Sequence, residues 1–195
     1  MLLFFEILIV FFGYGIVTSY CVYVRSHPED EYNGLYHDRE YGFPLKEDNL
    51  LFERLVLEIN QAGLSWITIL KKKDNFRRAY QGFDLKIVAK YGNKDVHRLL
   101  QDPGIIRNKI KINAAVENAR RILILQEEYG SFKSWLDANH PLALDGWTRI
   151  FKTNLVFTGS EIVREFLVST GYLSGAHDED CPIYKKVAIL KPAWL

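Results

Sequence analysis

The sequence predicts an all-α protein. Apolar residues recur at helical spacing along several segments, and helix-capping or helix-breaking residues separate these segments. The longest alternation of apolar and polar residues covers only 154–158, which is short for a strand. The chain has 195 residues, of which 48% are hydrophobic, and this is enough for one domain with a substantial core. We therefore expect helices joined by short loops.

The expected helices follow one another closely. Residues 22–46 are polar, aromatic and interrupted by Pro and Gly, so we expect mainly loop with a short helix. Asp48, Ser65 and Asp84 are expected N-caps, because their side-chain oxygens can accept hydrogen bonds from the first free N–H groups of a helix. The remaining helices are expected at about 49–61, 66–80, 85–90, 94–101, 107–129, 131–138, 144–152 and 160–170.

The first eighteen residues differ in composition from the rest. Residues 1–18 are almost entirely apolar, a bilayer-spanning helix needs roughly 20 such residues, and no Lys or Arg precedes them as in a signal peptide. Two interpretations stay open: a membrane anchor, or a segment upstream of the natural start. We divide the chain into this extension and a single domain at 19–195. We expect the domain to be cytoplasmic, on the side that Arg25 favours, with anchoring by residues 1–18 not excluded.

A carboxylate, a chain turn and an indole follow one another at residues 57–66. Glu58 lies near the inner end of an apolar helix, and Gly63 marks a turn before Trp66. A buried carboxylate needs a partner or must be neutralised. If both side chains face one cavity, they form a receptor for a flat cationic ring, since aromatic faces attract cations. The commoner alternative is a salt-bridged Glu and a core Trp.

A tight turn between two helices is expected at residues 99–109. Gly104 allows close backbone approach, and the free N–H groups of the incoming helix carry partial positive charge that can bind a phosphate. Arg107 and Lys109 add local charge. Because the net charge of the whole chain is only +1, nucleic-acid binding would depend on such local patches. The alternative is an ordinary connection between helices.

The two cysteines of the chain each have a histidine nearby in the sequence. Cys21 and His37 form one pair, and His177 and Cys181 form the other. Cysteine and histidine suit tetrahedral zinc, and four protein ligands indicate a structural site. Such a site would join the two ends of the domain. A disulfide between the cysteines, or ordinary structural roles for each residue, are the alternatives.

Two short strings are specific to one family. The string YHDREYG at 36–42 and the string AGLSW at 62–66, followed by GIIRN at 104–108, resemble the DNA-3-methyladenine glycosylase I family of the helix–hairpin–helix DNA glycosylase superfamily. The similarity runs from about residue 19 to residue 195. It implies a helix–hairpin–helix glycosylase-like fold whose lobes are tied by a structural Zn²⁺ site. It also implies a monofunctional hydrolase that flips 3-methyladenine out of alkylated double-stranded DNA and releases it.

The resemblance also implies roles for individual residues. Glu58 is the catalytic carboxylate, and the base is bound by Tyr36, Tyr41, which stands where the family often has Trp, and Trp66. The implied DNA contacts are Gly104, Ile105, Arg107 and Lys109, and the implied zinc ligands are Cys21, His37, His177 and Cys181. We expect a monomer without a protein partner. Two rival functions stay open: a protein that binds alkylated DNA without excision, and a membrane-tethered helical interaction protein.

Overall fold

The computed structural model describes residues 19–195, which form twelve α-helices and one short 3-10 helix. The helices are α1 (Tyr20–Ser26), α2 (Glu31–Arg39), α3 (Asp48–Gln61), α4 (Trp66–Leu70), α5 (Lys73–Ala79), η1 (Gln81–Phe83), α6 (Leu85–Val88), α7 (Asn93–Gln101), α8 (Lys109–Tyr129), α9 (Phe132–Asn139), α10 (Leu144–Asn154), α11 (Ser160–Ser169) and α12 (Pro182–Ile189). Since this part of the chain contains no strand, the predicted all-α fold is confirmed.

The apolar segment 1–18 lies outside the described residues. Both interpretations of this segment, a membrane anchor and a segment upstream of the natural start, therefore remain predictions. Within residues 19–195, no helix is both long and apolar enough to cross a membrane. The division of the chain at residue 19 stays a prediction.

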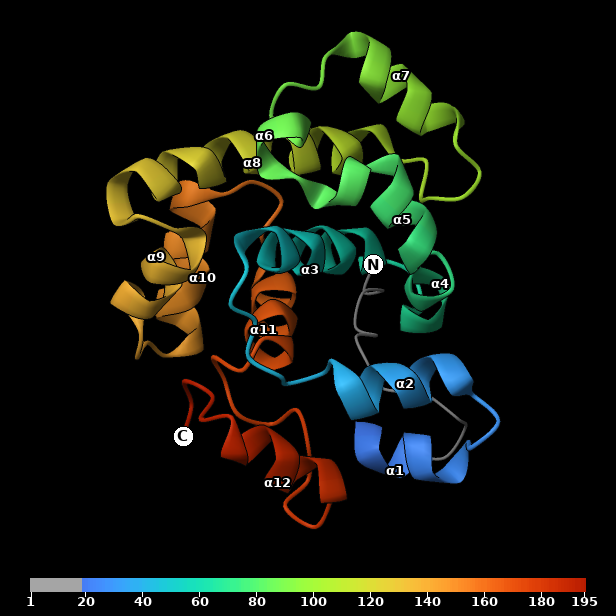
Figure 1. The fold of residues 1–195 in the computed structure, drawn as a ribbon, viewed down its shortest axis with the longest axis vertical. Helices are drawn as coiled ribbons and strands as arrows, with labels where there is room; N and C mark the ends of the chain where they lie inside the picture. Colours follow the sequence, from blue (N-terminus) through green and yellow to red (C-terminus); the bar gives the residue numbers. More distant parts are fainter. Residues whose placement is uncertain (1–18) are drawn as a thin grey trace, which may run out of the picture.

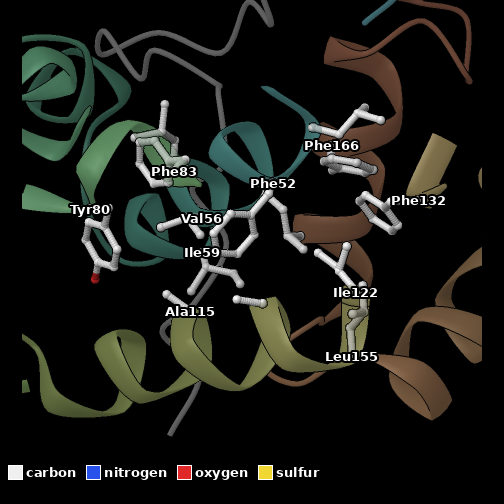
Figure 2. Packing of buried hydrophobic residues seen from close by; sticks show 14 of the residues in the cluster. Phe52, Val56, Ile59, Tyr80, Phe83, Ala115, Ile122, Phe132, Leu155 and Phe166 are labelled. Carbon is white, nitrogen blue, oxygen red and sulfur yellow. The ribbon is translucent and has the colours of Figure 1, made fainter. Parts of the chain in front are cut away.

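Helix α3 lies at the centre of the fold. In Figure 1 it crosses the middle of the molecule between α8 and α11, and it contacts both of them as well as α4 and α9. Residues 51–61 of α3 are all buried. Figure 2 shows Phe52, Val56 and Ile59 of this helix within the apolar cluster that also receives side chains from α8 and α11. Any charged side chain on so buried a helix needs partners in the interior, because an unpaired buried charge is costly.

The capping prediction for Asp48 is wrong. Helix α3 begins at Asp48 itself, and its N-cap residue Glu47 makes no side-chain cap. The Asp48 carboxylate instead accepts hydrogen bonds from the backbone N–H groups of Phe132 at 2.7 Å and Lys133 at 3.0 Å. It therefore satisfies free donors in the first turn of α9. This bond joins two segments that are 84 residues apart, a pairing that no local pattern reveals.

Other helix boundaries also differ from the prediction. The single helix expected at 66–80 is two helices, because the chain turns at Lys71 and Lys72 between α4 and α5. The long helix expected from residue 107 begins at Lys109, where Asn108 is the N-cap and accepts hydrogen bonds from two backbone N–H groups. Residues 22–46 contain most of α1 and all of α2, so this segment is more helical than predicted.

Helix α12 closes the fold against the N-terminal helices and was not expected from the sequence. Its first residue is Pro182, directly after Cys181, a position where the fixed φ of proline suits a helix start. Figure 1 shows α12 beside α1 and α2, away from α8. A separate small apolar cluster forms there from Cys21, Cys181, Ile183 and Val187. So small a cluster is a weak basis for holding these helices together.

Candidate active site and metal cluster

Glu58 is a buried carboxylate with little hydrogen bonding. Its side chain lies on α3 with 3% of the residue exposed. Within residues 19–195 its one recorded hydrogen bond is from the Ser169 hydroxyl on α11, at 3.5 Å. Burial, and next the negative charge of Glu165, raise the pKa of Glu58 to about 8, while the positive charge of Arg54 acts in the opposite direction. The carboxylate is thus held ready for a hydrogen-bond donor or a cation.

A small cavity opens beside Glu58. It measures about 30 Å³ and lies between the connection from α3 to α4 and the first turns of α11. Its lining residues are Glu58, Gln61, Ala62, Gly63, Leu64, Glu161, Ile162 and Glu165. A volume of this size holds about two water molecules, so a purine requires its walls to move apart. Leu64, a large apolar side chain that is exposed to solvent, forms one of these walls.

Tyr36 connects Glu58 to the aromatic residues of the site. Its ring centroid lies 5.0 Å from that of Trp66, with the planes at 60°, and 5.6 Å from that of Tyr41. Burial raises the pKa values of Tyr36 and Tyr41, and the charge of Glu58 acts on both in the same direction. None of the three aromatic residues, Tyr36, Tyr41 and Trp66, lines the cavity itself. The four residues that the sequence singled out therefore form one cluster, with Trp66 reached through Tyr36.

Arg54 sets the polarity of the Tyr36 hydroxyl. Its guanidinium lies over the Tyr36 ring at 4.9 Å from the centroid, and Nη1 donates to the Tyr36 oxygen at 2.9 Å. Because that oxygen accepts this bond, the hydroxyl proton of Tyr36 is free to be donated elsewhere. The indole N–H of Trp66 is a second buried donor, and it has no acceptor within residues 19–195.

Sequence reasoning missed Arg54, Glu165 and Ser169. Arg54 gave a signal, because it precedes Glu58 by four residues and so lies on the same face of an otherwise apolar helix. Glu165 and Ser169 gave none, since α11 begins about a hundred residues later in the chain and nothing local indicates which face meets α3. Glu165 is as buried as Glu58, and its Oε2 accepts from the Tyr41 hydroxyl at 3.3 Å.

The four predicted metal ligands meet at one point. All four donor atoms, from Cys21, His37, His177 and Cys181, lie within 4.8 Å of one another, and all four residues are buried. His37 Nε2 lies 3.2 Å from Cys21 Sγ, 3.2 Å from His177 Nδ1 and 3.8 Å from Cys181 Sγ. A tetrahedral ion with ordinary zinc–ligand bonds separates such atoms by about 3.3 to 3.8 Å. Both cysteines are free, so the disulfide alternative is not found.

The outer nitrogens of the two histidines are fixed by acceptors. His37 Nδ1 lies 2.7 Å from a carboxylate oxygen of Asp38, and His177 Nε2 lies 2.8 Å from the backbone oxygen of Tyr41. Such bonds select the tautomer that directs the other nitrogen at an ion. Burial lowers the pKa of His177, which favours the neutral imidazole that a metal requires. The bond to the Tyr41 oxygen also links this cluster to the aromatic residues beside Glu58.

The turn at 99–109 takes the predicted form, with two corrections. The Ile105 side chain is buried in the core, so only its backbone can reach a partner. The Gly104 N–H donates to Asp102 Oδ1 at 2.7 Å, and a side chain at Gly104 would lie 3.0 Å from Asn75. The close approach that this glycine permits is therefore made within the chain.

The exposed face of this turn carries unpaired donors and positive charge. Arg107 and Lys109 are exposed. Within residues 19–195 no acceptor is recorded for the backbone N–H groups of Ile106, Arg107 and Lys109. Lys72 of the α4–α5 turn donates to the Pro103 oxygen at 2.8 Å, which places another ammonium group beside the turn. Donors and cations gathered in this way suit an anion.

Replacing Glu58 with Gln is expected to stabilise the protein at alkaline pH. The folded-state pKa of about 8 lies above the ordinary value of 4.5. The stability that comes from protonating Glu58 is therefore complete below about 4.5 and is lost as the pH rises through about 8. Gln stays neutral, so the difference in melting temperature should move in favour of the variant as the pH is raised. Thermal denaturation at about pH 5 and about pH 9 measures it, and a difference independent of pH would contradict a buried, protonated Glu58.

Comparisons with known proteins agree with this arrangement. Residues 26–144 match the model of a protein family described as methyladenine glycosylase. DNA-3-methyladenine glycosylase 1 of Escherichia coli is 38% identical over 139 residues, covering 70% of this chain and 74% of the relative. DNA-3-methyladenine glycosylase of Haemophilus influenzae is 35% identical over 166 residues, covering 75% and 89%.

Solved structures are similar over the same region. A Staphylococcus aureus 3-methyladenine DNA glycosylase I, studied for its recognition of 3-methyladenine, has a TM-score of 0.74 at 32% identity. The match covers 80% of this chain and 92% of that chain. A variant of 3-methyladenine DNA glycosylase I in complex with 3-methyladenine has a TM-score of 0.73 at 32% identity, with 80% and 93% covered.

Proposed function

Since the chain belongs to the methyladenine glycosylase family, we propose that it releases 3-methyladenine from alkylated double-stranded DNA by hydrolysing the N-glycosyl bond. The observation that carries this is the buried carboxylate of Glu58, which faces a cavity and has one long hydrogen bond. Similar proteins bear the name of this activity, and two solved relatives are described with 3-methyladenine. Glu58 is the catalytic residue of the proposal, and Tyr36, Tyr41 and Trp66 form the base-binding wall.

The chemistry follows from the charge of the damaged base. Alkylation at N3 makes the purine cationic, so it is a good leaving group and is attracted to a carboxylate and to aromatic faces. A duplex must expel the nucleotide before the base reaches a buried cavity. The Tyr36 hydroxyl, whose oxygen accepts from Arg54, presents its proton to the base. Glu58 stabilises the positive charge that develops on the sugar, and water completes the hydrolysis.

No lysine is needed as a nucleophile. Lys109 is exposed on the turn rather than at the cavity. Lys111 is buried, but its ammonium donates to the backbone oxygens of Asn60 at 2.9 Å and Ala62 at 2.6 Å, so it caps the end of α3. We therefore propose a monofunctional enzyme that leaves an abasic site and does not cleave the strand.

We infer that the Cys–His cluster holds one Zn²⁺ ion. Two thiolates and two imidazoles are ligands that zinc prefers, and four of the separations between these atoms, at 3.2 to 3.8 Å, are close to those of a tetrahedral site. Because all four positions are filled by protein atoms, the ion would be structural and would join α1 and α2 to the segment before α12. It takes no part in the proposed reaction.

We further propose that the turn at 102–109 binds a DNA phosphate. The plot of log Kobs against log salt concentration has a negative slope. Arg107→Gln and Lys109→Gln should each make this slope shallower by about 1, because each variant loses one phosphate contact. Fluorescence anisotropy with duplex DNA over a range of salt concentrations measures the slope. Lys152, exposed on α10, provides the matched control. A slope that is equally affected by Lys152→Gln would argue for diffuse attraction instead of a defined contact.

Release of the base tests the main proposal. The full chain is incubated with duplex DNA alkylated by a methylating agent, and the supernatant is separated by chromatography. We expect free 3-methyladenine, and DNA strands that stay intact until alkali cleaves the abasic sites. Tight binding of the alkylated DNA without any free base would favour the rival role of a binding protein. We expect the enzyme to act as a monomer in the cytoplasm.

A further inference from the structure

The active-site cavity has a second buried carboxylate. Glu165 of α11 is 3% exposed and lines the same cavity as Glu58. One of its oxygens accepts from the Tyr41 hydroxyl, and the other is paired with Arg164, whose side chain is 40% exposed. Each carboxylate oxygen can accept a further bond. A ligand that enters the cavity therefore meets two carboxylates from two different helices.

Arg54 is a buried cation near Glu58, so a second carboxylate is needed if the cavity is to carry a net negative charge. Arg54 is fully enclosed, and its recorded partners other than Glu40 are neutral, namely the Tyr36 hydroxyl and the Ser169 backbone oxygen. Glu40 lies 3.4 Å from Arg54, but it is shared with Lys73 and is partly exposed. Arg54 and Glu165 shift the pKa of Glu58 in opposite directions, so both charges act at this carboxylate.

The charges at the cavity can be counted from these contacts. With Glu58 ionised, as the proposed reaction requires, Glu40 and Lys73 offset one another, which leaves Arg54 opposite Glu58 and gives no net charge at the base site. Apart from the attraction of aromatic faces for a cation, such a site offers a cationic purine no net electrostatic advantage over a neutral purine. When the Glu165 carboxylate is included, the net charge of these groups is −1. Arg164 and Glu161 are both about 40% exposed, so solvent screens their charges. Arg164 pairs with Glu165 as well as with Glu161, which also lines the cavity, so this group of one cation and two carboxylates keeps a net charge of −1.

We propose that Glu165 is a second base-binding carboxylate, which together with Glu58 gives the cavity its preference for purines made cationic by ring alkylation. This rests on the proposed function for the location of the base, but it is a statement about binding and can be tested without excision. Glu165 is not required to move a proton or to attack the sugar. It supplies negative charge and an acceptor on the wall opposite α3.

Two probes separate charge from shape. The 3,9-dimethyladeninium ion carries a fixed positive charge, with a methyl group in place of the sugar, and 9-methyladenine is its neutral counterpart. The full chain should bind the cation more tightly, as measured by calorimetry or competition. Glu165→Gln should weaken binding of the cation by about 10- to 100-fold, the range for a hydrogen bond to a charged group, and should change binding of the neutral probe much less.

A double variant tests whether the effect comes from charge. Arg54→Met combined with Glu165→Gln removes one positive and one negative charge, so Glu58 is left unopposed. The preference for the cation should return toward that of the unchanged protein. A merely structural role for Glu165 would not be rescued by removing Arg54. Glu127→Gln, an exposed site on α8, controls for loss of a distant negative charge.

Each outcome decides the proposal. An unchanged ratio of the two affinities in Glu165→Gln, or no recovery in the double variant, overturns it. If Glu165→Gln does not fold, Arg54→Met alone is used, and it should raise the preference for the cation; no rise counts against the proposal. Excision is a separate readout: a protein that releases no base from DNA but prefers the cation through Glu165 would refute the proposed function and retain this inference.

Discussion

Replacing Cys181 with Ser is expected to abolish stoichiometric zinc binding and to lower the free energy of unfolding by about 5 kcal/mol or more, since the binding energy of a structural zinc ion is largely folding energy. The four donor atoms join segments that are about 140 to 160 residues apart in the chain. Without the ion, these segments are joined by the small apolar cluster around Cys21, Ile183 and Val187 and by surface contacts such as the ion pair of Arg25 with Asp180. Burial would also leave the thiol of Cys21 protonated, because it raises the pKa of Cys21 to about 12.

Metal analysis and thermal denaturation of the full chain measure this effect. The unchanged protein should contain one zinc per chain, and a strong chelator should lower its melting temperature to that of Cys181→Ser. His97→Ala is the matched control, because His97 is exposed on α7 and lies outside the cluster. Equal zinc content in Cys181→Ser and in the unchanged protein would exclude this set of ligands.

The helical fold could be predicted because its signals are local. Asp84 caps α6 as expected, by accepting from the Ile87 N–H, and Asn93 opens α7. The break at Lys71 and Lys72 could not be predicted, since lysine is a good helix former. There the chain follows contacts to distant segments: Lys72 reaches the Pro103 oxygen, and the next residue, Lys73, pairs with Glu40. Tertiary contacts override local preference at this point.

The candidate site could be predicted only for residues that stand out from their neighbours in the sequence. Glu58 stands out because it is a charged residue on an apolar helix. The four metal ligands stand out because both cysteines of the chain lie near a histidine. Glu165 resembles any glutamate of an amphipathic helix, and its role appears only when α11 is packed against α3. The chemistry of the site therefore depends on a contact between helices that the sequence does not specify locally.

Glu58→Gln is expected to lower the single-turnover rate constant for release of 3-methyladenine by about 100-fold or more, the usual loss when one group that stabilises a transition-state charge is removed. The shape of the side chain is kept, and its charge is removed. Gln can still accept a hydrogen bond from the base, but it cannot balance the positive charge that develops on the sugar. Single-turnover release of base from alkylated duplex DNA, at enzyme concentrations above saturation, isolates this step from DNA binding.

The pH dependence of base release tests whether the lower rate of the Glu58→Gln variant comes from the missing ionisable group. In the free enzyme the pKa of Glu58 is about 8, so the ionised fraction grows as the pH rises through that value, and kcat/KM should rise with it. The Gln variant has no such group and should show a flatter profile.

The control is another buried glutamate on the same helix. Glu53 lies five residues before Glu58 and pairs with Arg77 at 2.9 Å, away from the cavity. Glu53→Gln makes the same chemical change and should destabilise the fold while leaving the rate of release nearly unchanged in the folded protein. If both variants slowed release equally, the loss would come from disturbance of α3, and Glu58 would have no special role in the reaction. A slow rate and a flat profile in Glu58→Gln alone would assign the catalytic charge to this residue.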